Sequence, residues 1–175
     1  MAFDVFFADE KHFDEVYELY RTVCKVLESS PYSPHWEIDE YPNKEDLHNL
    51  IEKKELLVCT AGDKIIGSVA VFNGENFDDG LEHPGEPVEG QTGIRLFAVL
   101  PGYRGMGVSD AMIAKAKEVT GERGHNELVL LVAKGNTPAE NLYKRNGFKF
   151  VKETIFYDSP DCGHDYYAYK YEVSH

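Results

Sequence analysis

The sequence predicts an α/β fold, in which a central sheet of about seven strands is flanked by about four helices. Hydrophobic residues recur at strand-like and helix-like periods in the order β-α-α-β-β-β-α-β-α-β-β. The chain has 175 residues, of which 42% are hydrophobic, values typical of a globular domain with a buried core. Neither a repeat nor a linker divides the sequence, so we expect a single domain over residues 1–175.

The first half of the chain predicts a strand, two helices and a hairpin. Apolar residues at helical spacing follow Asp9, a suitable helix cap, and Pro31 and Pro34 end this first helix. Asn43 can cap the second helix in the same way. The expected elements are a strand over 3–7, a helix from 9 to 31, a helix over 43–54, and strands over 56–60 and 64–72.

The second half predicts four strands and two helices. The apolar run from Leu128 to Val132 is typical of a central strand that is buried on both faces. Thr137 to Glu140 has the pattern of a capping box with proline at the first helical position, and Gly147 suits the end of that helix. The expected elements are strands over 92–100, 128–132, 148–157 and 165–173, and helices over 107–121 and 137–147.

The charge and composition exclude some classes of partner. The formal net charge of −13 argues against a nucleic-acid backbone or an anionic membrane as the main partner. No apolar run is long enough to span a membrane, and the N-terminal residues lack the pattern of a signal peptide. Three cysteines without close pairing argue against a disulfide framework. We therefore expect a cytoplasmic protein, and the sequence leaves both a monomer and a homodimer open.

One irregular segment, residues 73–90, concentrates acidic side chains and has neither lysine nor arginine. Structureless loops longer than about 12–15 residues are uncommon inside compact domains and are usually functional or disordered. The segment either attracts a cationic partner or serves solubility alone. Its carboxylates are those of Glu75, Asp78, Asp79, Glu82, Glu86 and Glu89.

The segment from Leu96 to Ser109 carries the strongest chemical signal. A predicted strand ends at Pro101, a turn follows, and a helix begins near Gly107. Backbone N–H groups at a helix start lack intrahelical partners and carry a partial positive charge, so they bind anions readily. Small residues let a diphosphate approach the backbone closely, and Arg104 adds a positive charge. We therefore predict a pyrophosphate site at residues 104–109.

Two sequence patterns indicate which pyrophosphate binds. The segment lacks a nucleotide P-loop, and Asp110 stands where a dinucleotide fingerprint has its third glycine. It fits instead the pattern R/Q-x-x-G-x-G/A, with Arg104, Gly107 and Ser109 at the three defined positions. A second pattern, N-x-x-A-x-x-L-Y-x-x-x-G-F, fits residues 136–148. In these two patterns and in its element order the chain resembles the GNAT superfamily of N-acetyltransferases.

This resemblance implies a mixed, mostly antiparallel sheet and an acyl-CoA-dependent N-acyltransferase that uses acetyl-CoA as cosubstrate and no metal. The diphosphate would lie on the backbone amides of the turn, and the pantetheine arm would pair with the strand before it. Asn136 would orient the arm, while Tyr143 either protonates the departing thiolate or packs in the core. The implied cofactor-binding residues are Phe97, Ala98, Val99, Arg104, Gly105, Met106, Gly107, Val108, Ser109, Asn136 and Tyr143.

The sequence departs from the family pattern at the general base. Many members carry a glutamate on the fourth strand, at positions that match Gly93 and Arg95 here. Glu89 is our candidate base and Tyr143 our candidate acid. An acceptor amine that is already partly neutral, such as an α-amino group with a pKa of about 7.7–8.0, would depend less on a general base to remove its proton. The other candidate bases are Glu86, Glu37, His35 and His83.

The acceptor is predicted only as a class, the primary amine of a small molecule or a peptide, which is cationic if the acidic segment borders it. By resemblance, Trp36, Glu86 and Glu89 would lie at the acceptor site. Trp36 either contacts the acceptor or packs in the core. Two other functions stay open, a CoA-binding regulatory or sensor domain without catalysis and an acidic protein that docks a basic partner.

Overall fold

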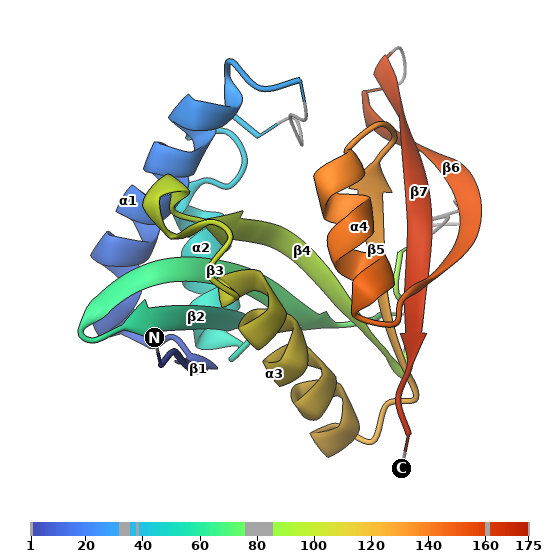
Figure 1. Ribbon diagram of the computed structural model, residues 1–175, viewed down its shortest axis with the longest axis horizontal. Helices are drawn as coiled ribbons and strands as arrows, with labels where there is room; N and C mark the ends of the chain where they lie inside the picture. The colour runs from blue at the N-terminus through green and yellow to red at the C-terminus, as the bar shows by residue number, and fades with distance from the viewer. Residues whose placement is uncertain (1, 32–35, 38, 76–85, 160–161, 175) are drawn as a thin grey trace. The chain divides into compact units, whose positions relative to one another are not determined.

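The computed structural model of the protein describes residues 2–31, 36–37, 39–75, 86–159 and 162–174 (Figure 1). The strands are β1 (Asp4–Phe7), β2 (Leu56–Ala61), β3 (Lys64–Asn73), β4 (Gln91–Val99), β5 (Glu127–Ala133), β6 (Lys149–Ser159) and β7 (Cys162–Glu172). The helices are α1 (Phe13–Leu27), α2 (Lys44–Glu52), α3 (Val108–Glu122) and α4 (Thr137–Arg145), with short 3-10 helices η1 (Glu10–His12) and η2 (Pro101–Tyr103). None of the helices in these ranges is long and apolar enough to cross a membrane.

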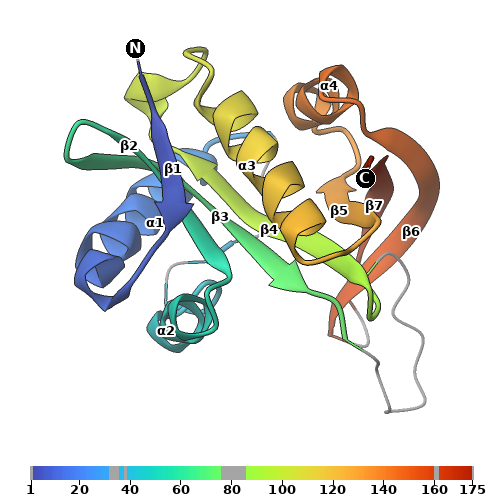
Figure 2. The same ribbon diagram turned by 90° about the horizontal axis from the view of Figure 1, so that it is seen from below.

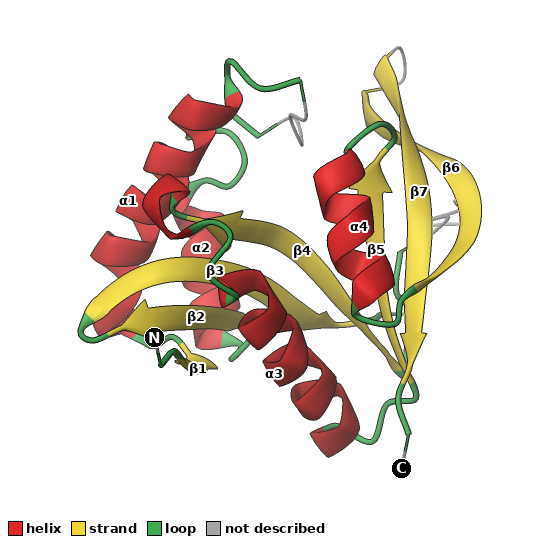
Figure 3. Ribbon diagram, viewed as in Figure 1, coloured by secondary structure: helices red, strands yellow, loops and turns green. Residues whose placement is uncertain are grey.

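The strands form one mixed sheet in the order β1-β2-β3-β4-β5-β7-β6 (Figure 3). The pairs β1–β2, β2–β3, β5–β7 and β6–β7 are antiparallel, whereas β4 and β5 are parallel from Gln91↔Glu127 to Ile94↔Leu130. Parallel neighbours need a long crossover connection, and α3 lies in the connection between β4 and β5. The mostly antiparallel sheet with its helices confirms the predicted fold class.

The chain divides into two compact units. The first consists of Met1–Phe72 and Arg95–Ala116, and the second of Asn73–Ile94 and Lys117–His175. Strand β4 and helix α3 therefore each contribute residues to both units.

In the first unit, α1 and α2 cover one face of the strands and the start of α3 lies on the other face (Figure 2). Apolar residues recur along α1 at a spacing that places them on one side of the helix, which packs on α2, β2 and β4. The resulting core consists of Ala8, Val16, Leu19, Tyr20, Val23, Leu47, Ile51, Leu56, Val58, Ile65, Ala70, Leu96 and Ala98.

A glycine in the middle of β3 brings α3 close to the sheet. A Cβ atom added at Gly67 would lie 2.9 Å from Met112 Cε and 3.1 Å from Val108 Cγ1. Glycine inside a strand often marks such a close approach. The first two turns of α3 therefore rest directly on the strand backbone, and both contacting side chains are buried.

In the second unit, α4 and the strands around it share an aromatic cluster. Tyr143 and Phe148 pack edge to face with ring centroids 5.6 Å apart, and Phe148 lies 5.6 Å from Tyr171. The ammonium of Lys117 lies 4.0 Å from the Tyr171 ring centroid and donates a hydrogen bond of 2.5 Å to the Asn146 carbonyl. These contacts fix the C-terminal end of α4.

The structure corrects three local predictions. Asp9 caps the 3-10 helix η1, and α1 begins only at Phe13 and ends at Leu27, before the proline. Strand β5 alternates between buried and half-buried residues, so it is not fully buried on both faces. The N-cap of α4 is Asn136, not Thr137, because the Asn136 side chain accepts a hydrogen bond of 3.3 Å from Ala139 N.

Candidate functional site

The predicted pyrophosphate turn, residues 104–109, joins η2 to α3 in the first unit. Gly105 and Gly107 both have a left-handed backbone, with φ of 74° and 86°. Residues with a side chain rarely adopt these values, so glycine allows the chain to reverse directly before the helix. Helix α3 begins at Val108, and its first turn is closed by a hydrogen bond of 3.0 Å from Ala111 N to Gly107 O.

The turn has an exposed edge and a buried anchor. Arg104 and the three residues after it are exposed, and Met106 is half exposed at 50%. Val108 is buried, and it packs with Met112 against Gly67 of β3. The backbone N–H groups at this helix start are thus held on a rigid base while the outer side of the turn meets solvent.

Strand β4 leads into this turn through an unusual backbone. Leu96 has φ of 55°, although it carries a side chain and lies inside a strand. Non-glycine residues in this region are strained by about 1–3 kcal/mol and persist only where their surroundings hold them. Here the Leu96 carbonyl accepts a hydrogen bond of 2.7 Å from the Tyr20 hydroxyl of α1.

The predicted pantetheine-pairing residues follow this kink directly. Ala98 is buried in the core of the first unit, whereas Phe97 and Val99 are half-buried. The next residue, Leu100, donates a hydrogen bond of 2.9 Å from its N–H to Ile66 O of β3. The backbone of residues 97–99 is therefore fixed at both ends, by the kink on one side and by β3 on the other.

Asn136 and Tyr143 lie at opposite ends of α4 in the second unit. The side-chain oxygen of Asn136 is engaged as the N-cap of the helix. Tyr143 is buried and its ring packs on Phe148. Burial raises the pKa of the Tyr143 hydroxyl far above its ordinary value. The phenol therefore keeps its proton at neutral pH and can act as a donor.

The candidate bases come from different segments of the chain. Gly93 is buried, and the Arg95 guanidinium stacks on the Phe72 ring at 3.8 Å from its centroid. A guanidinium does not accept a proton, so neither position supplies a base on β4. Glu89 is exposed and Glu86 half-buried, both directly before β4. His35, His83 and Glu82 lie outside the described residues.

Trp36 contacts the core of the first unit. Its ring lies 5.9 Å from the Tyr20 ring in an edge-to-face arrangement, and it packs against the buried cluster. These contacts favour the packing interpretation of Trp36. The adjacent Asp39, a left-handed residue, accepts a hydrogen bond from the Tyr17 hydroxyl. The region after α1 is thereby tied to that helix.

Sequence reasoning missed the pair Tyr20 and Leu96. Tyr20 fits the apolar side of an amphipathic helix, and no pattern distinguishes it from a tyrosine that only packs. Leu96 has no residue type that predicts a left-handed backbone. Both become visible only when α1 is packed against β4.

A glycine turn at the start of a helix, entered from a kinked strand of a mixed sheet, is an arrangement in an α/β protein that suits anion binding. Comparison with known proteins specifies the family. A model described as the acetyltransferase (GNAT) family matches residues 13–148, well over half of the chain. The chain therefore belongs to the GNAT acetyltransferase family, as the two sequence patterns predicted.

Individual relatives agree with this membership. The chain is 37% identical over 68 residues to the mycothiol acetyltransferase of Clavibacter sepedonicus, a match that covers 39% of this chain and only 22% of that protein. It is similar in structure to the PaiA N-acetyltransferase of Thermoplasma acidophilum in complex with coenzyme A, with a TM-score of 0.71, 18% identity, and 95% and 98% of the two chains covered. For an N-acetyltransferase of Staphylococcus aureus Mu50 the TM-score is 0.75 at 10% identity, over 99% and 100% of the chains. At these identities the structural likeness shows the fold.

Proposed function

We propose that this protein is an N-acetyltransferase that transfers the acetyl group of acetyl-CoA to the primary amine of an acceptor by direct attack. Family membership supports acetyl transfer. The observation that carries the proposal is the turn at residues 104–109, where two left-handed glycines precede α3 and Arg104 is exposed. A related fold holds coenzyme A in the Thermoplasma protein, which supports the same ligand here.

The cosubstrate would bind to two backbone segments of the first unit. The diphosphate would lie on the amides of residues 104–109, where the helix start favours negative charge. The pantetheine arm would pair with Phe97 and Val99 as an added strand. Ser109 takes the place of the usual glycine or alanine, and its hydroxyl would donate to a phosphate oxygen.

The reaction requires two proton transfers. A neutral amine attacks the thioester carbonyl, the C–N bond forms and the C–S bond breaks. Glu89 would receive a proton from the amine, and Tyr143 would give one to the departing CoA thiolate. A tyrosine phenol is protonated at neutral pH, as the second role requires.

Two assays test the proposal against its alternatives. Calorimetric binding of acetyl-CoA, followed by release of free CoA with a panel of amines, is expected for the enzyme. If acetyl-CoA binds but no amine causes the release of free CoA, a regulatory or sensor domain is favoured. That outcome would be consistent with Gly93 and Arg95 at the usual positions of the base. Absence of binding would refute the proposal and leave a docking protein.

Asn136 has two roles that a pair of variants separates. Asn136→Ala removes the cap of α4, which is expected to lower the free energy of unfolding by about 0.5–2 kcal/mol. Asn136→Ser keeps a capping oxygen but lacks the amide donor. If Asn136 orients the pantetheine arm, both variants should weaken acetyl-CoA binding in calorimetry. Wild-type affinity in the serine variant would show that the residue serves only as a cap.

The acceptor class is predicted from charge. We propose a cationic amine, such as a polyamine, a basic peptide end or an amino sugar, because Glu86 and Glu89 precede β4 in a chain of net charge −13. Carboxylates raise the local concentration of a cation, an effect that salt screens over about 8 Å. The KM for the acceptor should therefore rise with ionic strength and rise further in the variant Glu86→Gln/Glu89→Gln.

The matched control for this prediction is Glu45→Gln/Glu52→Gln, which removes two exposed carboxylates of α2 and changes the net charge equally. The control should keep the wild-type KM. A flat salt dependence together with an unchanged KM in Glu86→Gln/Glu89→Gln would direct the search to neutral or acidic amines.

A further inference from the structure

The kink of β4 at Leu96 is unusual because a residue with a side chain has a positive φ inside a strand. Among the described residues, three that are not glycine have positive φ, namely Asp39, Lys54 and Leu96. Asp39 and Lys54 lie in turns, where such values are tolerated, whereas Leu96 lies inside a strand and is buried. A left-handed residue in a strand bends the backbone locally and changes the direction of the hydrogen-bonding groups beside it.

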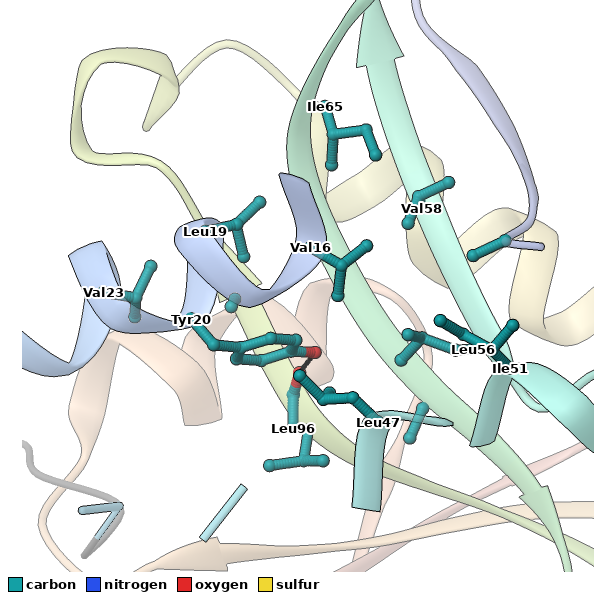
Figure 4. Packing of buried hydrophobic residues seen from close by; sticks show 13 residues of the cluster. Val16, Leu19, Tyr20, Val23, Leu47, Ile51, Leu56, Val58, Ile65 and Leu96 are labelled. Carbon is teal, nitrogen blue, oxygen red and sulfur yellow. Dashed lines mark hydrogen bonds between the residues drawn. The ribbon is translucent and has the colours of Figure 1, made fainter. Parts of the chain in front are cut away.

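A buried side-chain donor contacts this kink. The Tyr20 hydroxyl lies in the hydrophobic core of the first unit and donates to the Leu96 carbonyl at 2.7 Å (Figure 4). A buried hydroxyl needs a partner, and so does a carbonyl turned away from the strand ladder. Burial also raises the pKa of Tyr20, so the donor stays protonated. Tyr20 and Leu96, which are 76 residues apart in the sequence, are thereby joined across α1 and β4.

The strand beyond the kink is the part proposed to bind the cosubstrate. Ala98 faces the core together with Leu96, and Phe97 and Val99 are less buried. If the Leu96 carbonyl lost its donor, the strand would gain by relaxing to an extended backbone. Such relaxation would turn the amides of residues 97 and 99 to a different direction.

We propose that Tyr20 is a positioning residue for the acyl-CoA arm, because its hydroxyl holds the Leu96 kink that aims the backbone of Phe97 and Val99. The inference rests on the proposed function, since it assigns to Tyr20 a part in binding the pantetheine arm. Tyr20 itself does not touch the cosubstrate in this proposal. It acts through the carbonyl of Leu96, and its hydroxyl also interacts with the side chain of Ser68 on β3. Its ring serves the core in the same way as a phenylalanine would.

The test uses Tyr20→Phe, which removes only the hydroxyl. The Kd of acetyl-CoA should rise on the order of tenfold, the loss expected for one hydrogen bond. The Kd of 3′-phosphoadenosine 5′-diphosphate, which lacks the pantetheine arm, should stay within about twofold because it needs only the turn at 104–109. Amide hydrogen exchange at Phe97 and Val99 should become faster in the ligand-free variant, while exchange in β2 stays unchanged.

Ile51→Val is the matched control for lost stability. Ile51 is buried in the same core but lies on α2 and does not contact the kink through a hydrogen bond. Its truncation should lower the melting temperature without changing either Kd. The inference is wrong if Tyr20→Phe weakens the binding of both ligands equally. It is also wrong if Ile51→Val raises the Kd of acetyl-CoA as much as Tyr20→Phe does. Either result would show that Tyr20 has only a structural role.

The outcome separates this inference from the proposed function. If the wild-type protein binds acetyl-CoA and Tyr20→Phe binds it equally well, the inference is wrong and the function stands. If the wild-type protein binds neither ligand, the proposed function is refuted, and the role of Tyr20 in cosubstrate binding is refuted with it.

Discussion

Gly107→Glu is expected to abolish acetyl-CoA binding and to leave the fold intact. The glutamate side chain would stand where the diphosphate is proposed to lie, so a negative charge would oppose the phosphates and their approach to the backbone would be blocked. Gly107 is exposed, and an added Cβ meets no other atom within 4 Å, so the substitution does not disturb the core. Calorimetry measures the binding, and circular dichroism checks the fold.

Gly62→Glu separates this electrostatic effect from backbone strain. Gly62 lies in the turn between β2 and β3, has φ of 61°, and likewise has no atom within 4 Å of an added Cβ. A side chain at positive φ costs about 1–2 kcal/mol at either position. The control should lose comparable stability and keep its affinity. Near-wild-type affinity in Gly107→Glu with unchanged circular dichroism would remove residues 104–109 from the cosubstrate site.

Tyr143→Phe is expected to lower kcat by ~10²–10⁴-fold with little change in the affinity for acetyl-CoA. Tyr143 is the proposed acid for the CoA thiolate, and no other part of its side chain is lost in the variant. The ring continues to pack on Phe148, so the core of the second unit should be preserved. Steady-state kinetics with a saturating acceptor and direct binding of acetyl-CoA together measure the two quantities.

Tyr171→Phe provides the comparison for this prediction. Tyr171 belongs to the same aromatic cluster, through Phe148 and Lys117, and has no assigned role in the reaction. Its kcat should remain within about threefold of the wild type. A loss below threefold in Tyr143→Phe as well would assign Tyr143 to packing and leave the leaving-group acid to another residue or to water.

The sequence predicted the elements and the turn because each has a local signal. Period-two and period-3.6 hydrophobicity follow from the geometry of strands and helices, and Asn43 caps α2 as its residue type suggests. The left-handed backbone of Gly105 and Gly107 agrees with the small residues that the diphosphate motif requires. In these places, the local conformation depends on a few neighbouring residues in the sequence, so the residue types predict it.

The features that were missed depend on tertiary contacts. The cap of α4 was assigned one residue late, since Asn136 and Thr137 are both good caps and only the geometry chooses between them. The run from Leu128 to Val132 cannot show which face of β5 is less covered. The kink at Leu96 is held by Tyr20, and a contact over 76 residues has no trace in either local sequence.

Gly67 shows how a mutational scan of this protein could mislead. An added Cβ atom would lie 2.9 Å from the end of the Met112 side chain and 3.1 Å from Val108 Cγ1. A small side chain would displace mainly the flexible end of Met112, whereas a large one would push the start of α3 away from β3 and displace the turn with it. Large substitutions at position 67 would then lower acetyl-CoA affinity although the residue does not contact the ligand. A ranking of positions by lost activity would place Gly67 among the ligand contacts, although it lies beneath the helix and serves as a spacer.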